Sequence, residues 1–253
     1  MTTAIVSALP EEQAALRQQL AQATEVRLAS RTFLSGTLCG QPVVLALSGI
    51  GKVAAAITAS TLIHHFRATQ LVFTGVAGGL HKTAMVGDVV VASELLQHDM
   101  DASPLAPRHV VPQTGLSRFP VSERLSALLL QACREVLRQD SDLLALLRTF
   151  HPAARAAVHR GLVVSGDQFI NSVHACHRLR NELPDALAVE MEGASVAQVC
   201  HDHGVEFAIM RTISDRADAT AHVDFLAFVR DVACIYSDRV VTNWLSRQQR
   251  DVD

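Results

Sequence analysis

Hydrophobic residues occur along this chain in short runs, which alternate with longer stretches where small and apolar residues recur at the helical period. The short runs predict strands at residues 3–9, 43–47, 71–74, 88–92, 161–164, 187–189 and 207–211. The longer stretches predict helices at residues 11–21, 52–66, 122–137 and 173–183. This alternation predicts an α/β fold with a central mixed, mostly parallel sheet flanked by helices on both faces.

The end of the chain predicts one long amphipathic helix whose apolar side belongs to the core. Apolar residues recur there three or four positions apart, at Phe225, Val229, Val232, Tyr236, Val240 and Trp244. Residues 102–120 instead hold four prolines and no clear periodicity, which indicates a long loop of the kind that often covers a site. Residues 139–159 predict a surface insertion with a short helix. The whole chain, residues 1–253, is predicted to form a single domain.

Composition excludes several classes of protein. The net charge is −3, and neither a basic stripe nor a polybasic tract is present, which argues against nucleic-acid and membrane partners. No apolar window is long enough to span a bilayer, and the first residues lack the pattern of a signal peptide. The chain has five cysteines, an odd number, and none of them forms a C-x-x-C motif. This is typical of the reduced thiols of a cytoplasmic protein. The histidines lack metal-binding spacing, so we expect no metal and no other cofactor.

Two carboxylates, Glu190 and Glu192, stand where a predicted strand gives way to a helical pattern. Ligands bind at the carboxyl ends of strands in open α/β sheets, so one or both of these residues are candidates for a site. The alternative is that they are first-turn acids, which a helix N-terminus stabilises.

Three further strand ends carry residues suited to a ligand. Residues 49–54 fit G-x-G-x-x-A between a strand and a helix, which either binds a phosphate or only allows tight packing. Residues 75–80 form a second glycine turn, either a cradle or a kink, and residues 165–171 offer an aromatic ring to a planar base. The strand at 207–211 leads into Asp215, which is either a general acid or a turn cap. Together these strand ends predict a shared cleft.

In this order the motifs resemble those of the 5′-methylthioadenosine/S-adenosylhomocysteine nucleosidases, which belong to the nucleoside phosphorylase and nucleosidase superfamily. The matching segments are residues 7–12 (SALPEE), 48–54 (SGIGKVA), 75–80 (GVAGGL), 164–170 (VSGDQFI), 189–192 (VEME) and 211–218 (RTISDRAD). The resemblance spans nearly the whole chain, and implies hydrolysis of the N-glycosidic bond of an adenine thionucleoside in methionine salvage.

The resemblance also implies the catalytic residues. Glu12 matches the base that positions and deprotonates the attacking water, and Asp215 matches the acid that protonates adenine N7. Ser214 matches a residue that orients this acid, and Arg211 one that helps to hold the water and the acidic cluster. The chemistry requires such a pair, because ribosyl transfer passes through an oxocarbenium-like state and an acid must neutralise the departing purine.

Substrate contacts follow from the same resemblance. Met191 and Glu192 match ribose contacts, with Glu192 accepting from hydroxyl groups. The other positions implied to bind substrate are Val76, Gly78, Phe169 and Ile170 in the glycine turn and adenine slot, Phe225 on the wall near the 5′ substituent, and Leu9, Ile50 and Leu105 around the 5′ site.

Some positions depart from the family pattern. Leu9 stands where a Met is usual, and Val76 where many members have a Ser. That position helps to bind phosphate in related phosphorylases, so Val76 argues for hydrolysis. In dimeric members an aromatic loop reaches the partner's 5′ site, and residues 102–107 (ASPLAP) match it here without aromatics. A homodimer is therefore expected, the preferred 5′ group stays open, and the alternatives are a phosphorylase or a non-catalytic nucleoside-binding protein.

Overall fold

The computed structural model describes residues 2–150, 156–217, 225 and 227–250 of the chain. Asp218, the last residue of the final motif, lies outside the described residues. The strands are β1 (Thr3–Ser7), β2 (Ala21–Leu28), β3 (Arg31–Leu38), β4 (Gln41–Leu47), β5 (Gln70–Gly79), β6 (Val89–Gln97), β7 (Arg118–Pro120), β8 (Val158–Ser165), β9 (Ala186–Glu190) and β10 (Glu206–Asp215). The helices are α1 (Pro10–Gln19), α2 (Lys52–His64), α3 (Glu123–Gln139), α4 (Ser141–Phe150), α5 (Val173–Glu182), α6 (Gly193–His203) and α8 (Cys234–Arg250), with a π-helical turn η1 (Val229–Ala233).

Part of the sheet closes on itself. Strands β5, β9, β8, β6 and β10 each pair with the next, and β10 pairs back with β5. The sheet then continues from β5 through β1, β4 and β3 to β2. Among the described strands five pairings are parallel and five antiparallel, so the predicted mixed α/β fold is confirmed with a larger antiparallel share than expected.

The hairpin of β2 and β3 was missed by the sequence analysis. Most residues of β2 are exposed, because it lies at the edge of the sheet with little apolar surface to bury. A polar edge strand lacks the apolar run from which strands were predicted. The hairpin also ends the first helix at Gln19, two residues earlier than predicted, since Ala21 already belongs to β2.

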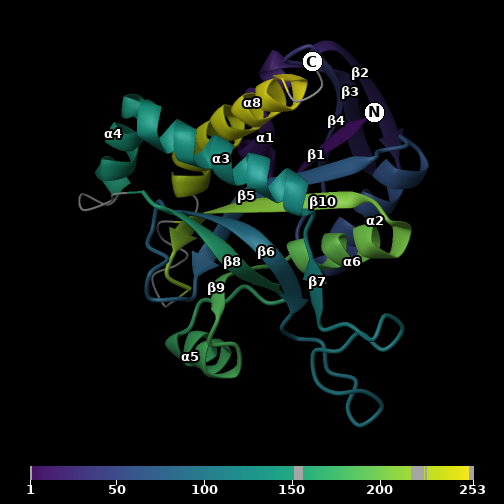
Figure 1. Cartoon of the computed structure of the whole chain (residues 1–253), viewed down its shortest axis with the longest axis vertical. Helices are drawn as coiled ribbons and strands as arrows, with labels where there is room; N and C mark the ends of the chain where they lie inside the picture. The colour runs from purple at the N-terminus through teal and green to yellow at the C-terminus, as the bar shows by residue number, and fades with distance from the viewer. Residues whose placement is uncertain (1, 151–155, 218–224, 226, 251–253) are drawn as a thin grey trace.

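Helices cover both faces of the sheet (Figure 1). Helices α1, α3, α4 and α8 lie together on one face, where Leu16 and Trp244 belong to the same buried cluster. Helices α2 and α6 lie on the other face and contribute Ala55 and Val196 to a second cluster. Helix α5 packs through Leu179 on a third, smaller cluster that includes residues of β8 and β9. No helix in the described ranges is long and apolar enough to cross a membrane.

The C-terminal segment is helical as predicted, but it is not one uniform α-helix. The five predicted core positions from Val229 to Trp244 are at most 2% exposed, which confirms the apolar side as core. The π-helical turn η1 precedes α8, and such a turn inserts an extra residue into the helical repeat.

The insertion at 139–159 contains the predicted short helix, α4. Leu143 and Leu147 of this helix are buried, and the ring of Phe150 lies 5.8 Å from that of Phe228. The described part of the insertion therefore joins the core beside α8 and is not simply a surface feature. The predicted loop at 102–120 is largely irregular, and its end forms the three-residue strand β7.

Candidate active site

A pocket opens where the carboxyl ends of several strands meet. Strands β1, β5 and β10 run parallel to one another, so their carboxyl ends lie at the same edge of the sheet. The pocket has an empty volume of ≈ 710 Å³, which includes open solvent at its mouth. It is lined by Ala8, Leu9, Glu12, Ile50, Val76, Ala77, Gly78, Gln168, Phe169, Ile170, Val189, Glu190, Met191, Glu192, Arg211, Ser214, Asp215 and Phe225.

Glu12 is a buried carboxylate at the start of α1, immediately after β1. Its Oε2 accepts hydrogen bonds from the backbone N–H groups of Ala8 (2.8 Å) and Leu9 (2.9 Å), and its Oε1 accepts one from that of Val76 (3.0 Å). Burial raises the pKa of the Glu12 carboxyl above its ordinary value, although the Arg211 charge and the three N–H groups act in the opposite direction. A carboxylate has about four acceptor sites, so roughly one remains for a further donor.

Gly75 allows Glu12 and Arg211 to approach the same part of β5. A Cβ atom at this position would lie 2.6 Å from Glu12 Oε1 and 2.6 Å from Arg211 Nη1. Any side chain would therefore push these two charged groups apart. This close approach explains why position 75, in the second glycine turn, is a glycine.

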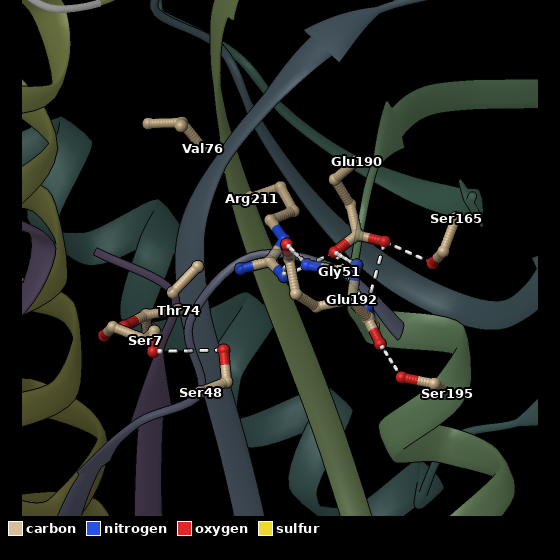
Figure 2. A network of polar contacts seen from close by, with 12 residues as sticks. Ser7, Ser48, Gly51, Thr74, Val76, Ser165, Glu190, Glu192, Ser195 and Arg211 are labelled. Atoms are coloured by element: carbon tan, nitrogen blue, oxygen red, sulfur yellow. Dashed lines mark hydrogen bonds and ion pairs between the residues drawn. The ribbon is translucent and has the colours of Figure 1, made fainter. Parts of the chain in front are cut away.

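Glu190 forms a buried ion pair with Arg211, at 2.5 Å between Oε2 and Nη2, and Figure 2 shows this pair at the centre of a polar network. Glu190 also accepts hydrogen bonds from the Ser165 hydroxyl and from the backbone N–H groups of Glu192 and Gly193. The carboxylate therefore binds the N-terminus of α6, as the first-turn alternative predicted, and its acceptor sites are filled. Glu190 therefore lines the pocket, but its carboxylate binds other protein groups and not a ligand.

Glu192 has acceptor capacity left. Its Oε1 accepts a hydrogen bond from the Gly51 N–H (2.9 Å), while its Oε2 lies 3.8 Å from Arg211 Nη2. Burial, followed by the negative charge of Glu190, raises the pKa of Glu192 to about 8, against the effect of Arg211. Of the two carboxylates, Glu192 is the one able to bind a ligand. The glycine turn at 49–54 here binds a carboxylate by one of its backbone N–H groups.

Replacing Glu192 with Gln is expected to stabilise the fold and to weaken activity. The pKa of Glu192 rises from 4.5 to about 8 on folding, so the wild-type protein loses stability as pH increases across that window. Glutamine cannot ionise, so the gain in Tm of the variant over wild type should be larger at about pH 9 than at about pH 5.5. We expect kcat/KM to fall about 10²-fold, because a carboxyl group that can ionise beside the sugar is lost.

Thermal unfolding of Glu192→Gln at both pH values measures this effect. The control is Glu25→Gln on the exposed hairpin, where Glu25 pairs only at the surface with Arg27. The control should show no pH-dependent gain. An equal gain in Tm at both pH values for Glu192→Gln would show that the raised pKa of Glu192 is not the cause of the gain.

Asp215 is the last residue of β10, and it lines the pocket. Its Oδ2 accepts the Ser214 hydroxyl at 2.8 Å, and its Oδ1 accepts the Ala217 N–H at 2.7 Å. The Ser214 hydroxyl therefore orients the carboxyl, and the contact with Ala217 gives the backbone N–H of the following turn a hydrogen-bond partner. A Cβ atom at Gly78 would lie 3.1 Å from Asp215 Oδ1, so this glycine leaves room for the acid.

The remaining wall of the pocket is apolar. The rings of Phe169 and Phe225 lie 5.6 Å apart at 77°, and Phe169 is 43% exposed. Ile170 is buried beside them, and Ile50 stands 61% exposed at the pocket. Two aromatic rings beside a row of carboxylates suit a ligand with a planar apolar part and a hydroxylated part.

Comparison with known proteins gives a consistent result. The model of the phosphorylase superfamily matches residues 2–245. The chain belongs to this superfamily. It is 35% identical over 240 residues to the 5′-methylthioadenosine/S-adenosylhomocysteine nucleosidase of Anoxybacillus flavithermus, covering 95% of this chain and 96% of that protein.

Solved structures agree. The crystal structure of the nucleosidase of the same name from Neisseria meningitidis, in complex with methylthio-immucillin-A, has a TM-score of 0.84 at 36% identity and covers 96% of this chain and 98% of that one. Futalosine hydrolase of Helicobacter pylori has a TM-score of 0.83 at 31% identity, with 96% and 97% covered. Within the phosphorylase superfamily, the chain is therefore a member of the 5′-methylthioadenosine/S-adenosylhomocysteine nucleosidase family, a family of hydrolases.

The pocket of this superfamily member carries more acidic than basic side chains. Four carboxylates line it, and Arg211 is the single Lys or Arg among the described lining residues. Arg211 is itself paired with Glu190. Val76, the position where many members have a Ser, contributes an apolar side chain to the pocket. No group of three or more metal-binding side chains gathers anywhere in the described ranges.

The structure of this superfamily member gathers all but one of the predicted site residues around the pocket. The exception is Leu105, which does not line the pocket and is 92% exposed in the loop after β6. Sequence reasoning did not identify Ser165 as a partner of Glu190, nor the Gly51 N–H as a partner of Glu192. Both lie within quoted motifs, but their partners are distant in sequence, and spacing alone carried no signal for them.

Proposed function

We propose that this enzyme hydrolyses the N-glycosidic bond of 5′-methylthioadenosine and S-adenosylhomocysteine, and releases adenine and a 5-thioribose. The observation that carries the proposal is the pairing of a nearly saturated buried base, Glu12, with an oriented acid, Asp215, in one pocket. Displacement of adenine by water is much faster with both, because the nucleophile must lose a proton and the leaving group must gain one.

Glu12 is the proposed base. Three backbone N–H groups hold its carboxylate in place and leave about one acceptor site, which suits a single water molecule. The raised pKa of Glu12 brings its basicity closer to what proton abstraction at neutral pH requires. As the bond between C1′ and N9 breaks, the water attacks C1′ and gives its proton to Glu12.

Asp215 is the proposed acid. Its proton passes to N7 of adenine, so that the base departs as a neutral molecule. Ser214 donates its hydroxyl proton to Oδ2 and so fixes the carboxyl orientation. Phe169 is the proposed stacking partner of the adenine ring, with Ile170 beside it and Phe225 towards the 5′ substituent.

Glu192 is the proposed ribose contact. Its Oε2 retains acceptor capacity for the ribose hydroxyls, and the ionised form of the carboxyl, whose share grows as the pH approaches its raised pKa, favours the positive charge that develops on the sugar in the transition state. Met191 lies next to it in the pocket wall. Glu190 and Arg211 keep Glu192 in place through the N-terminus of α6.

The charge of the pocket favours hydrolysis over phosphorolysis. A phosphate ion would enter among four carboxylates with one arginine that is already paired, and Val76 offers it no hydroxyl. An anion in such surroundings is disfavoured by like charge and by burial. The phosphorylase alternative therefore lacks an observation in its favour.

The test is to incubate the purified protein with each of the two substrates, with and without phosphate, and to separate the products by chromatography. We expect adenine and the free thioribose at the same rate in both buffers. Release that requires phosphate would identify a phosphorylase. Substrate binding without any adenine release would identify a non-catalytic nucleoside-binding protein.

We further propose a homodimer in the cytoplasm, active in methionine salvage. Val53 and Ile57 lie one helical turn apart on α2 and are 71% and 41% exposed, next to Ile50 at the pocket. An exposed apolar strip of this kind supports a contact between copies. Leu105 would then reach the 5′ site of the partner, and the five free cysteines suit a reducing compartment. Light scattering after size exclusion measures the oligomeric state, and a monomer would contradict this proposal.

A further inference from the structure

Beside the pocket, three charged residues from separate segments form a closed ring of polar contacts: Lys52 begins α2, and Asp99 and Asp167 lie in the loops after β6 and β8. Lys52 Nζ lies 2.6 Å from Asp99 Oδ1, the backbone N–H of Asp167 donates to Asp99 Oδ2 at 2.8 Å, and the backbone N–H of Lys52 donates to Asp167 Oδ1 at 2.8 Å. Gln97 adds a fourth contact, because its Oε1 accepts from Lys52 Nζ at 3.2 Å. None of these residues lines the pocket.

The ring joins segments that bind different parts of the proposed substrate. Lys52 follows Gly51, whose N–H holds the ribose contact Glu192. Asp167 begins the segment that carries Gln168, Phe169 and Ile170, which form the adenine side of the pocket. Asp99 stands after β6, at the start of the loop that leads to Leu105. The Asp167 side chain links the two segments directly, because its Oδ1 accepts the backbone N–H of Lys52.

Gly51 provides an independent sign that these loops are closely packed. Its backbone has φ of +97°, and a Cβ atom there would lie 3.1 Å from Asp167 Oδ1. The turn therefore needs glycine both for its conformation and for its contact with the carboxylate of Asp167. A shift of the Asp167 segment would be felt directly at the N–H group that binds Glu192.

The cluster is more than a surface ion pair. The side chains of Lys52 and Asp99 are 18% and 25% exposed. Partial burial acts to raise the pKa of Asp99, but the hydrogen bonds from Lys52 and from the Asp167 N–H lower it overall, so its carboxylate stays charged. A partly buried network of several charge-assisted bonds is stronger than an isolated exposed pair.

We propose that Lys52 is a positioning residue for the reaction: with Asp99 and Asp167 it clamps the adenine segment against the ribose turn and so sets the width of the substrate site. The inference rests on the proposed function. We expect the clamp to act mainly on the adenine segment, whose contacts hold the substrate equally in the ground state and in the transition state. Its loss should therefore raise KM and leave kcat nearly unchanged.

The experiment compares Lys52→Met, Lys52→Arg and Asp99→Asn with wild type, by steady-state kinetics on methylthioadenosine and by calorimetric binding of free adenine. We expect Lys52→Met and Asp99→Asn each to raise KM and the Kd of adenine about tenfold, with kcat within about twofold. The double variant Lys52→Met/Asp99→Asn should raise KM no more than the single variant with the larger increase, because both residues belong to one network. Lys52→Arg keeps the charge and should restore most of the affinity.

The matched control is Arg247→Met. Arg247 pairs with Glu135 between α8 and α3, away from the pocket, and these side chains are 20% and 25% exposed, close to the values for Lys52 and Asp99. Arg247→Met should lower Tm without changing KM or adenine affinity. If Lys52→Met behaves like this control, the clamp is only structural and the inference fails. Absence of turnover by wild type would instead refute the proposed function, and adenine affinity would still test the clamp.

Discussion

Replacing Asp215 with Asn is expected to slow adenine release about 10³-fold, the largest effect of any single substitution in this enzyme apart from loss of the base. Asparagine has nearly the shape of aspartate, and its carbonyl oxygen can still accept from Ser214 or from the Ala217 N–H. It has no acidic proton for N7, so adenine would have to leave as an anion. Single-turnover release of adenine from bound methylthioadenosine measures this step directly.

A matched control and a modified substrate sharpen the test. Asp202→Asn, on the exposed side of α6, removes a carboxyl group far from the chemistry and should leave turnover unchanged. An analogue with carbon in place of N7 cannot accept the proton, so wild type should bind it without cleaving it. Turnover of Asp215→Asn near the wild-type rate would show that another group supplies the proton.

The sequence was most informative where chemistry and a strand end coincide within a few residues. Glu12, Glu192 and Asp215 each lie within four residues of the end of an apolar run, and the structure brings all three to one pocket. What local pattern could not decide was which carboxylate of the pair at 190 and 192 faces a ligand. Glu190 is occupied by Arg211, Ser165 and the start of α6, and these partners meet only because strands β5, β9, β8, β6 and β10 close into a ring.

Elements without an apolar run were not predictable in the same way. Strand β2 is stabilised by pairing at the sheet edge more than by burial, and β3 buries only Phe33 and Leu38, so both carry a weak hydrophobic pattern. The clamp of Lys52, Asp99 and Asp167 likewise depends on the start of α2 and two loops that only the folded sheet brings together. Leu105 lies outside the pocket of its own chain, and a role at a 5′ site depends on the proposed second copy.

Replacing Glu12 with Gln is expected to reduce kcat about 10³-fold as well, by removing the base instead of the acid. The amide presents one oxygen and one NH₂ group to three backbone N–H donors, so at least one donor loses its partner, at a cost of about 1–3 kcal/mol. Loss of a buried charge offsets part of that cost, so the variant should remain folded. Glu11→Gln, one residue earlier and exposed, is the control and should keep both activity and Tm.

The pH dependence separates a catalytic role of Glu12 from a structural one. A base works only when ionised, and burial raises the pKa of Glu12, so the wild-type rate should fall on acidification at a higher pH than for an ordinary carboxyl. The residual rate of Glu12→Gln should lack this fall.

A small anionic nucleophile separates the two roles further. Azide needs no proton removed to attack C1′, and it should enter the site more readily once the Glu12 charge is gone. It should therefore accelerate adenine release by Glu12→Gln and not by Asp215→Asn, whose missing proton azide cannot supply. Equal acceleration of both variants would mean that the base and acid roles are not divided between these two carboxyl groups.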